Sequence, residues 1–313
     1  MKENIIKNRM AKNWKQLKKM ASKNSYEALR LYDRDIPEFP YIVEKYNDHF
    51  VVWEKGKEGY EYRERNKLVK EALADIFSAD DAHICFKKRL RQRGTNQYDR
   101  LEHTNEYFSI QEGPFQFRIN IQDFLDTGLY LNHRPLREEI HKLSSGKKFL
   151  NLFSYTSSMS VAAALGGAIT TSIDLSNTYL KWGKENFKLN QLDPEKHYFV
   201  KENVLLHLEK CQNLGKSFDL IYCDPPTFSN SKKMSENFEI QEDHEKLIER
   251  CMSVLSAKGS LYFSGHKKNF KLSYEITSKF EVSDMSIKSV PLDFRNKKIH
   301  YLYKIEHKLK KEK

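Results

Sequence analysis

The chain has 313 residues, enough for one catalytic domain of common size and a smaller module. Hydrophobic residues make up 39% of it and charged residues 31%, and no apolar run is long enough to span a bilayer, so the composition excludes a membrane-spanning protein and predicts a cytoplasmic one. The formal net charge of +11 favours a polyanionic partner.

The first predicted element is a basic amphipathic helix over residues 4–23. Its apolar positions recur at helical spacing and are Ile6, Met10, Trp14, Leu17 and Ala21. The cations around that stripe are Lys7, Lys12, Lys15, Lys18 and Lys19. We expect the stripe to dock on the rest of its domain and the lysines to attract a polyanion, although a solvated lysine face would by itself explain the same pattern.

The sequence predicts a small α+β module up to residue 120. Short apolar runs predict strands over residues 41–44, 50–53, 83–86, 107–111 and 115–119, and a helical pattern covers residues 62–77. Glu112-Gly113-Pro114, between the last two runs, predicts a hairpin turn. We therefore expect an RNA-binding module over residues 1–120 and a catalytic domain over residues 121–313.

A second basic segment, residues 87–98, lies inside this module. The residues in it that we expect to contact RNA are Lys88, Arg89, Arg91, Arg93, Asn96, Gln97 and Tyr98. Guanidinium and amide groups can bond phosphates and base edges, and a tyrosine can stack on an unpaired base. So many planar donors together favour RNA contact over an irregular linker.

From residue 148 onward, strand and helix patterns alternate along the chain. Predicted strands cover residues 148–153, 169–173, 197–200 and 218–223, and predicted helices cover residues 159–165, 176–190 and 204–211. Ser176 is the predicted N-cap of the middle helix. The alternation predicts an α/β fold with a doubly wound, mostly parallel sheet, which binds ligands at the carboxyl ends of its strands.

The turns after the first two of these strands indicate the kind of cofactor. Residues 154–158 read Ser-Tyr-Thr-Ser-Ser, without the glycines that let backbone N–H groups approach a pyrophosphate. Asp174 follows the second strand, where sheets of this kind place a carboxylate on ribose hydroxyls. A ribose without a phosphate chain favours S-adenosylmethionine.

The segment Asp224-Pro225-Pro226-Thr227-Phe228 comes directly after a buried strand. The two prolines fix their φ angles and donate no backbone hydrogen bonds, so they predict a rigid, polar rim beside the ligand site. Such a rim suits methyl transfer to a flat nucleobase.

Several stretches of the chain resemble the RlmK family of 23S ribosomal RNA guanine-N7 methyltransferases, often found as the C-terminal half of the bifunctional protein RlmKL. The residues that carry the resemblance are 31–38, 91–98, 123–129, 151–156, 174–180, 224–231 and 299–300. The resemblance implies a Rossmann-like class I methyltransferase that uses S-adenosylmethionine and acts on large-subunit rRNA. It leaves open whether a separate methyltransferase replaces the usual fused half, and it leaves the oligomeric state open.

The resemblance also assigns the site. The residues assigned to the cofactor are Arg134, Asn151, Phe153, Ser154, Tyr155, Thr156, Asp174, Leu175, Ser176, Asn203, Val204 and Asp224. Asp224 is expected to orient the base or the sulfonium, Pro225 and Pro226 to keep the rim rigid, and Phe228 to stack on the flipped base.

Three positions depart from the family pattern. Ser157 stands where a glycine is usual, Asn203 stands where an aspartate is usual, and Asn132 replaces the aspartate of a Leu-Asp-His-Arg string. We expect the side-chain oxygen of Asn203 to accept a hydrogen bond from the adenine amine. These departures concern the affinity for the cofactor.

Guanine N7 carries a free lone pair, so methyl transfer to it depends on positioning and on removing the base from its stack, and requires no general base. Cytosine C5 methylation is the first alternative and requires a cysteine nucleophile. Related C5 enzymes carry that cysteine in a Phe-Ser-Cys-like string, where this chain has Phe263-Ser264-Gly265. His266, which follows, could donate to guanine O6 or be a surface residue.

The cysteines Cys85, Cys211, Cys223 and Cys251 are widely spaced and predict reduced thiols and no metal site. Cys223 is adjacent to the rim, but strand alternation directs it into the core. Two further alternatives stay open, namely a non-catalytic rRNA-binding assembly factor and methylation of a small metabolite.

Overall fold

The computed structural model describes residues 4–56, 62–88, 101–229 and 238–308. Two compact units divide the chain. The first contains residues 1–131 and 292–296, and the second contains residues 132–291 and 297–313. No helix in these described ranges has both the length and the apolar character needed to cross a membrane.

Unit 1 is an α+β unit built on a four-stranded sheet in the order β1-β2-β3-β4. The first three strands pair antiparallel and β4 runs parallel to β3. A separate antiparallel hairpin, β5–β6, turns at Gly113, whose φ of +59° suits glycine. The elements are α1 (Ile5–Asn24), β1 (Ala28–Asp33), β2 (Tyr41–Tyr46), β3 (His49–Glu54), α2 (Arg63–Phe77), β4 (Ile84–Lys88), β5 (Phe108–Glu112) and β6 (Phe115–Ile119).

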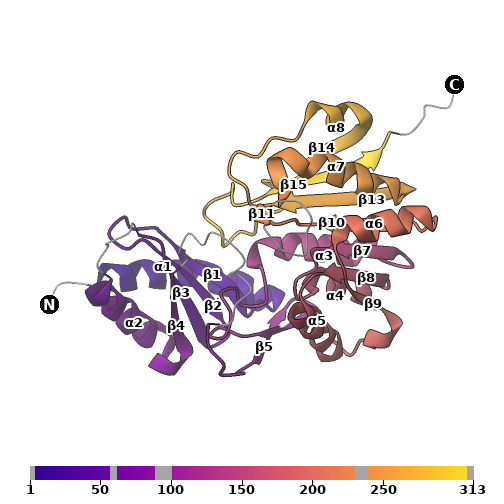
Figure 1. Ribbon diagram of the computed structural model, residues 1–313. Helices are drawn as coiled ribbons and strands as arrows, with labels where there is room; N and C mark the ends of the chain where they lie inside the picture. The colour runs from indigo at the N-terminus through magenta and orange to yellow at the C-terminus, as the bar shows by residue number, and fades with distance from the viewer. Residues whose placement is uncertain (1–3, 57–61, 89–100, 230–237, 309–313) are drawn as a thin grey trace. The chain divides into compact units, whose positions relative to one another are not determined.

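Both long helices of unit 1 cover the same face of its sheet (Figure 1). On α1 the predicted apolar stripe packs inward, with Ile6 and Met10 fully buried and Trp14 and Leu17 partly buried. Val69 and Leu73 of α2 join the same core. The predicted docking of the basic helix through its stripe is therefore confirmed.

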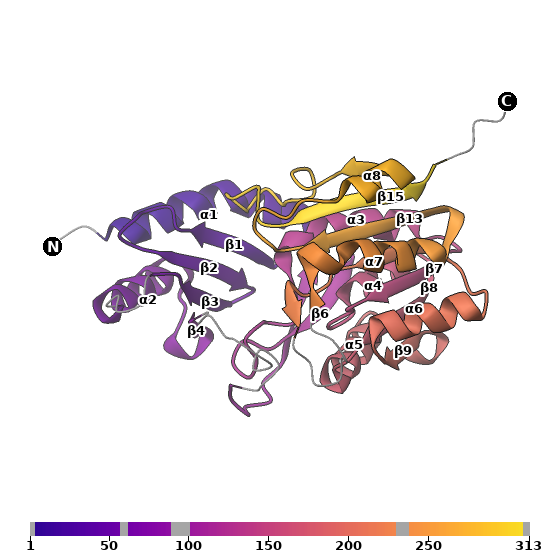
Figure 2. The same cartoon turned by 45° about the horizontal axis from the view of Figure 1, so that its top comes forward.

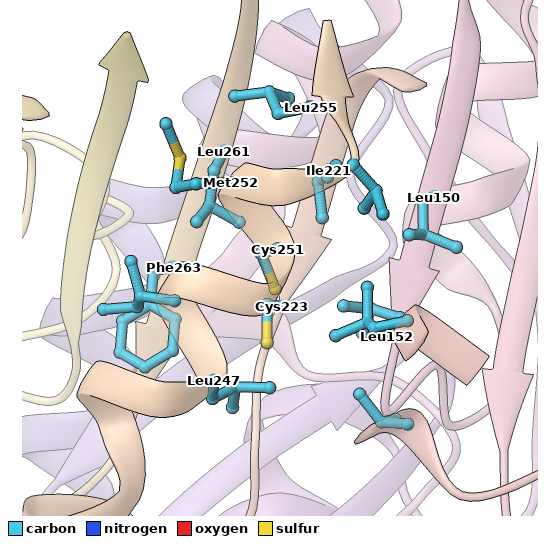
Figure 3. Packing of buried hydrophobic residues seen from close by; sticks show 14 of the residues in the cluster. Leu150, Leu152, Ile221, Cys223, Leu247, Cys251, Met252, Leu255, Leu261 and Phe263 are labelled. Atoms are coloured by element: carbon cyan, nitrogen blue, oxygen red, sulfur yellow. The ribbon is translucent and has the colours of Figure 1, made fainter. Parts of the chain in front are cut away.

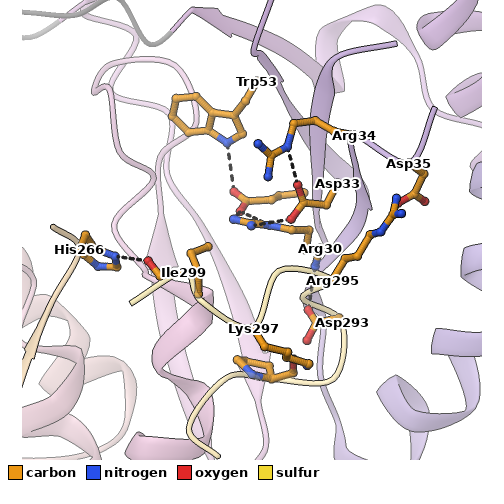
Figure 4. A network of polar contacts seen from close by, with 12 residues as sticks. Arg30, Asp33, Arg34, Asp35, Trp53, His266, Asp293, Arg295, Lys297 and Ile299 are labelled. Atoms are coloured by element: carbon orange, nitrogen blue, oxygen red, sulfur yellow. Dashed lines mark hydrogen bonds and ion pairs between the residues drawn. The ribbon is translucent and has the colours of Figure 1, made fainter. Parts of the chain in front are cut away.

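The opposite face of this sheet carries a buried polar network (Figure 4). Arg30 bonds Glu44 at 2.8 Å and Asp33 at 3.2 Å, and Trp53 donates its indole N–H to Glu44 at 3.1 Å. The backbone N–H of Arg30 donates to Asp293, and its guanidinium lies 3.9 Å from the centre of the Phe294 ring. The segment 292–296 thus joins unit 1 through this network.

The division between the units differs from the predicted one after residue 120. Residues 121–131 belong to unit 1 because they close against its strands. Lys87 donates to the carbonyl oxygens of Phe124 and Leu125, and the Tyr46 hydroxyl lies 3.0 Å from that of Thr127. These contacts join residues far apart in sequence, which local composition does not reveal.

Unit 2 contains a seven-stranded sheet in its described residues, in the order β14-β15-β13-β10-β7-β8-β9. Strands β13, β10, β7, β8 and β9 run parallel, and β15 runs antiparallel between β13 and β14. The strands are β7 (Lys148–Leu152), β8 (Ile169–Asp174), β9 (Tyr198–Lys201), β10 (Phe218–Cys223), β13 (Leu255–Gly265), β14 (Phe280–Asp284) and β15 (Tyr301–His307). The short pair β11 (Phe228–Ser229) and β12 (Phe238–Glu239) stands apart.

Helices cover both faces of this sheet (Figure 2). The first three are α3 (Arg134–Leu143), α4 (Ser158–Leu165) and α5 (Asn177–Leu189), and the others are α6 (Val204–Asn213), α7 (Ile240–Ser253) and α8 (Tyr274–Lys279). One face packs against α3 and α4, and the other against α6, α7 and α8. The predicted doubly wound, mostly parallel sheet is confirmed.

The core between the sheet and the helices α6 and α7 contains three of the four cysteines, and Figure 3 shows two of them. Cys223 of β10 and Cys251 of α7 are fully buried and their sulfur atoms face one another. Leu150, Leu152 and Ile221 belong to the same core. Cys223 therefore packs inward, as strand alternation predicted.

Candidate active site

The loops at the carboxyl ends of the parallel strands form the candidate site. From β7 the chain continues to β8 and β9 on one side, while β10 lies on the other side of β7, so the order of strands reverses there. Ligands bind open α/β sheets at such a reversal. Cys223 of β10 is paired with Leu152 of β7 and with Phe263 of β13. The residues that follow them, Asp224, Phe153 and Ser264, therefore lie at the same level of the sheet.

Asp174 ties two of these loops together. Its carboxylate accepts the backbone N–H of Tyr155 at 2.9 Å and that of Ser176 at 2.8 Å. Burial raises the pKa of this carboxyl to about 6, and the backbone donors act in the opposite sense. A carboxylate has about four acceptor positions, so capacity is left for a ribose hydroxyl.

The loop 153–157 takes a glycine-like backbone without containing glycine. Phe153, Tyr155 and Ser157 have φ values of 56°, 49° and 57°, in the left-handed region. Ser157 is fully buried, and its hydroxyl has no hydrogen-bond partner among the described residues. A Cβ on Gly183 of α5 would lie 2.6 Å from that hydroxyl. Glycine at 183 thus makes room for the serine at 157.

We expect Ser157→Gly to raise the free energy of unfolding by about 1 kcal/mol. Glycine removes the strain of the positive φ and the cost of the buried, unpaired hydroxyl, and each of these stabilises the folded state by at most about 1–3 kcal/mol. The greater conformational entropy of glycine in the unfolded chain opposes this by about 0.5–1 kcal/mol. Gly183→Ala should destabilise the parent and be tolerated in the Ser157→Gly background. Urea unfolding of the four chains measures this coupling. Ser158→Gly is the control, because position 158 is helical and glycine there should destabilise.

Asn203 and Ser176 cap the helices that follow their strands. The Ser176 hydroxyl accepts the N–H of Tyr179, which confirms the predicted N-cap. The side-chain oxygen of Asn203 accepts the N–H groups of Leu205 and Leu206 at 2.9 and 3.2 Å. An amide oxygen has two lone pairs. The expected acceptance from an adenine amine therefore does not fit, and the Nδ2 donor is the group left to meet a base.

Other residues that the resemblance assigns to the cofactor are buried or half-buried. Asn151 is buried and donates to Ser160 of α4 at 2.8 Å, while its Oδ1 has no hydrogen-bond partner among the described residues. Thr156 is buried and its carbonyl accepts from Asn186. Val204 is in the core, Leu175 is half-buried, and Arg134 is buried at the start of α3.

Asp224 lies among hydrogen-bond donors and imidazole rings. Ser264 donates to its carboxylate at 3.1 Å, and Nε2 of His133 lies 3.7 Å from it. Burial raises the pKa of this carboxyl, while His266 and the hydroxyls of Ser264 and Tyr222 favour its ionised form. The ionised carboxylate could therefore interact with a cation or accept a hydrogen bond.

A cluster of histidines around Asp224 was not foreseen. The ring of His133 stacks on that of His300 with centroids 5.1 Å apart, and His266 meets it edge-on at 5.7 Å. Burial lowers the pKa of His133 well below its usual value and that of His300 to about 4, so both are neutral at pH 7. Asn132 Nδ2 and the Ser289 hydroxyl hold the two nitrogens of His300 at 2.9 and 2.7 Å.

His266 is fixed by the backbone of the segment before β15. Its Nδ1 lies 3.3 Å from the carbonyl oxygen of Ile299 (Figure 4). His133, Asp224 and His266 each offer one ligand atom, and these atoms lie within 4.8 Å of one another. The predicted absence of a metal site stays a prediction.

The structure describes the rim, residues 224–228, and only the first two residues of the basic segment 87–98. Pro225 is buried, Pro226 is half-buried, and Phe228 is 48% exposed. Lys88 is exposed, pairs with Glu54 at 3.2 Å, and lies over the Tyr62 ring. Arg89, Arg91, Arg93, Asn96, Gln97 and Tyr98 lie outside the described residues.

Comparison with known proteins decides the family. Residues 58–269 match the family model for S-adenosylmethionine-dependent methyltransferases. The chain is 44% identical to ribosomal RNA large subunit methyltransferase K of Neisseria meningitidis serogroup B over 306 residues, covering 96% of the chain and 86% of that protein. It is 42% identical to methyltransferase K/L of Saccharophagus degradans, with 97% of the chain covered, and spans 41% of that longer protein.

The chain belongs to the methyltransferase K family of S-adenosylmethionine-dependent enzymes. A solved structure supports the fold of this methyltransferase. A SAM-dependent methyltransferase from Streptococcus mutans superposes with a TM-score of 0.78 at 24% identity, covering 96% of this chain and 80% of that one.

The residues present in this methyltransferase fit its cofactor, S-adenosylmethionine. The buried Ser154 hydroxyl has no hydrogen-bond partner among the described residues, and it stands in the loop after β7. At the end of the neighbouring strand β8, the Asp174 carboxylate can accept further hydrogen bonds. After β9, the side-chain NH2 group of Asn203 can donate one. These three groups suit an amino-acid tail, a ribose and an adenine ring, none of which carries a phosphate.

Proposed function

We propose that this chain transfers the methyl group of S-adenosylmethionine to N7 of a guanine in large-subunit (23S) ribosomal RNA. The observation that carries the proposal is the Asp224 carboxylate, held by Ser264 beside neutral imidazoles at the end of β10. When bound, the cofactor supplies an electrophilic methyl group on a sulfonium.

The groups around Asp224 suit a reaction that creates positive charge on the base. Guanine N7 carries no proton, so its methylation leaves the ring cationic and requires no proton acceptor. The carboxylate attracts that charge, and the neutral rings of His133 and His300 do not oppose it. Asp224 can also accept from the base N–H groups, and Phe228 can stack on its face.

The structure disfavours cytosine C5 chemistry at this site. The cysteine position of the C5 enzymes corresponds to Gly265 in this chain. A Cβ there would lie 2.5 Å from Cζ of Tyr301, a buried ring that stacks on Phe270 at 4.0 Å. Burial also raises the pKa of Cys223, which disfavours the thiolate.

Ribosomal RNA as the substrate is supported by the names of the relatives and by charge. The Neisseria and Saccharophagus relatives are named for the large-subunit RNA. The net charge of +11 and the acid-free helix α1 supply cations for phosphates. Contact through residues 88–98 and a cytoplasmic location belong to the proposal.

Removal of the cysteines tests the reaction type. We expect the chain with Cys85, Cys211, Cys223 and Cys251 replaced by Ser or Ala to keep its rate of methyl transfer within about tenfold, since N7 attack forms no covalent enzyme adduct. Because the latter three are buried, thermal melting must first show that the variant folds.

The product decides the proposal. Nucleoside mass spectrometry of rRNA from cells with and without this protein should show N7-methylguanosine lost from the large subunit. A loss of 5-methylcytidine, with an RNA adduct trapped on a cysteine, would place the chain in the C5 group. An unchanged set of nucleosides, together with defective subunit assembly, would favour the non-catalytic factor.

A further inference from the structure

A cavity in unit 1 is the strongest candidate for a site that the methyl-transfer chemistry does not use. It is an open pocket of about 530 Å³, and this volume is within the range of small-ligand pockets. The last turns of α1, the turn after it and the β2–β3 hairpin form its walls. The lining residues that matter are Trp14, Lys18, Lys19, Tyr26, Lys45 and Asn47.

Two of the lysines that line this cavity form no ion pair with any described residue, although the carboxylate of Glu27 also lines it. Helix α1 contains no acidic residue, and in the described part of the chain neither Lys18 nor Lys19 forms an ion pair. On the neighbouring helix α2, by contrast, Lys67 pairs with Glu71 and Lys70 with Asp81. Lys18 and Lys19 are therefore available to pair with an anion that the described chain does not provide.

The acid that does line the cavity is engaged. Glu27 accepts the backbone N–H of Gln111 at 2.7 Å, which ties its carboxylate to the β5–β6 hairpin. The ammonium of Lys45 is held by the carbonyl oxygen of Asn47 and lies 5.6 Å from the centre of the Trp14 ring. Burial lowers the pKa of Lys45. A bound phosphate would compensate the desolvation of this ammonium.

Rigid aromatic groups stand beside the cations. Trp14 is half-buried and meets the Phe77 ring edge-on at 5.3 Å, which fixes its position. The backbone N–H of Tyr26 donates to Ala21, so the turn that presents this second ring is held against α1. Aromatic rings beside lysines are the groups that proteins use to bind single-stranded nucleic acid, because bases stack and phosphates pair.

We propose that this cavity binds one unpaired nucleotide of the RNA substrate, with its base against Trp14 or Tyr26 and its phosphate against Lys18, Lys19 and Lys45. This rests on the proposed function, because it assumes an RNA substrate. The nucleotide is distinct from the one that is methylated, and the cavity thus contributes to substrate binding and not to the chemical step.

Two charge-matched double variants test the proposal. Lys18→Ala/Lys19→Ala removes the unpaired cations of α1, and Lys67→Ala/Lys70→Ala removes paired cations of α2 as the control. With a single-stranded rRNA oligonucleotide, the first should lower the slope of log affinity against log salt by about 0.7 for each phosphate that is no longer neutralised, and the second should keep the parental slope. For methyl transfer, the first should raise KM on the order of tenfold and leave kcat unchanged.

A cross-linking measurement needs no variant. Oligonucleotide carrying 5-iodouridine should, on irradiation, attach to the peptide that contains Trp14 or to the one that contains Tyr26. Attachment only elsewhere, equal slopes in the two variants, or equally good competition by polyglutamate would each overturn the nucleotide site.

The two proposals fail in different ways. If cross-links map to the cavity but the methylated atom is not guanine N7, the nucleotide site stands and the reaction is reassigned. If N7-methylguanosine forms while the cross-links and slopes are negative, the reaction stands and the cavity does not bind RNA. Cofactor affinity of the Lys18→Ala/Lys19→Ala chain, measured by calorimetry, should equal that of the parent in either case.

Discussion

Asp224→Asn is expected to lower kcat for methyl transfer at least on the order of a hundredfold. The substitution keeps the size of the side chain and removes its charge. Opposite unit charges about 4 Å apart attract by about 4 kcal/mol at an effective dielectric constant of about 20. Since about 1.4 kcal/mol corresponds to a factor of ten in rate, even a partial loss of this attraction accounts for two orders of magnitude. Single-turnover kinetics at saturating cofactor measure the effect.

The same strand offers a matched control. Asp219 lies near the opposite end of β10, where its carboxylate accepts from Lys148 N and from the Ser256 hydroxyl. Asp219→Asn should change stability and leave kcat within a few-fold of the parent. Equal rates for Asp224→Asn and the parent would remove Asp224 from the chemistry.

The pH profile gives a second reading of Asp224. Burial raises the pKa of its carboxyl, so kcat of the parent should fall on the acidic side at a pH above that expected for an exposed aspartate. The Asp224→Asn chain should lack this acidic limb. No alkaline limb is expected, because N7 attack requires no general acid.

Asp174→Ala is expected to weaken S-adenosylmethionine binding at least on the order of tenfold. The decrease combines removal of the ribose hydrogen bonds, about 1.5–3 kcal/mol for each bond to a charged group, with release of the loop that Tyr155 N–H ties to this carboxylate. RNA affinity should be spared. Calorimetry measures both, and Glu195→Ala, which removes an exposed carboxylate paired with Lys184, is the control.

Removing a ribose hydroxyl from the ligand separates the loss of the ribose hydrogen bonds from the release of the loop. The parent should bind S-adenosylhomocysteine more tightly than its 2′-deoxy analogue, and the Asp174→Ala chain should bind both alike if the carboxylate contacts the ribose. If both chains discriminate equally, Asp174 acts through the loop alone.

Acid should weaken cofactor binding through the same group. Burial raises the pKa of Asp174 to about 6, so affinity should fall as the pH drops through about 6 and the carboxyl gains a proton. Its effect on folding has the opposite sign. A carboxyl with a raised pKa in the folded state contributes stability that is present below its unfolded pKa and is lost as the pH rises through about 6.

The sequence by itself determined the local elements and the positions of the polar strand ends. The apolar runs predicted β7, β8 and β10, and the helical pattern predicted α1 and α2, because alternation and helical periodicity depend on near neighbours in the chain. Ser176 was identified as a cap for the same reason. Strand β1, helix α7 and the pair β14–β15 were not predicted, although α7 buries one face at helical spacing.

Only the tertiary structure decided which distant residues meet. His133 stands before α3, His266 follows β13 and His300 precedes β15, and only the packing of the unit brings the three rings together beside Asp224. Segment 292–296 joins unit 1 through the buried Arg30 network, and Gly183 makes room for Ser157. Strand order and such long-range contacts are selected by the free energy of packing the whole chain, which no local pattern contains.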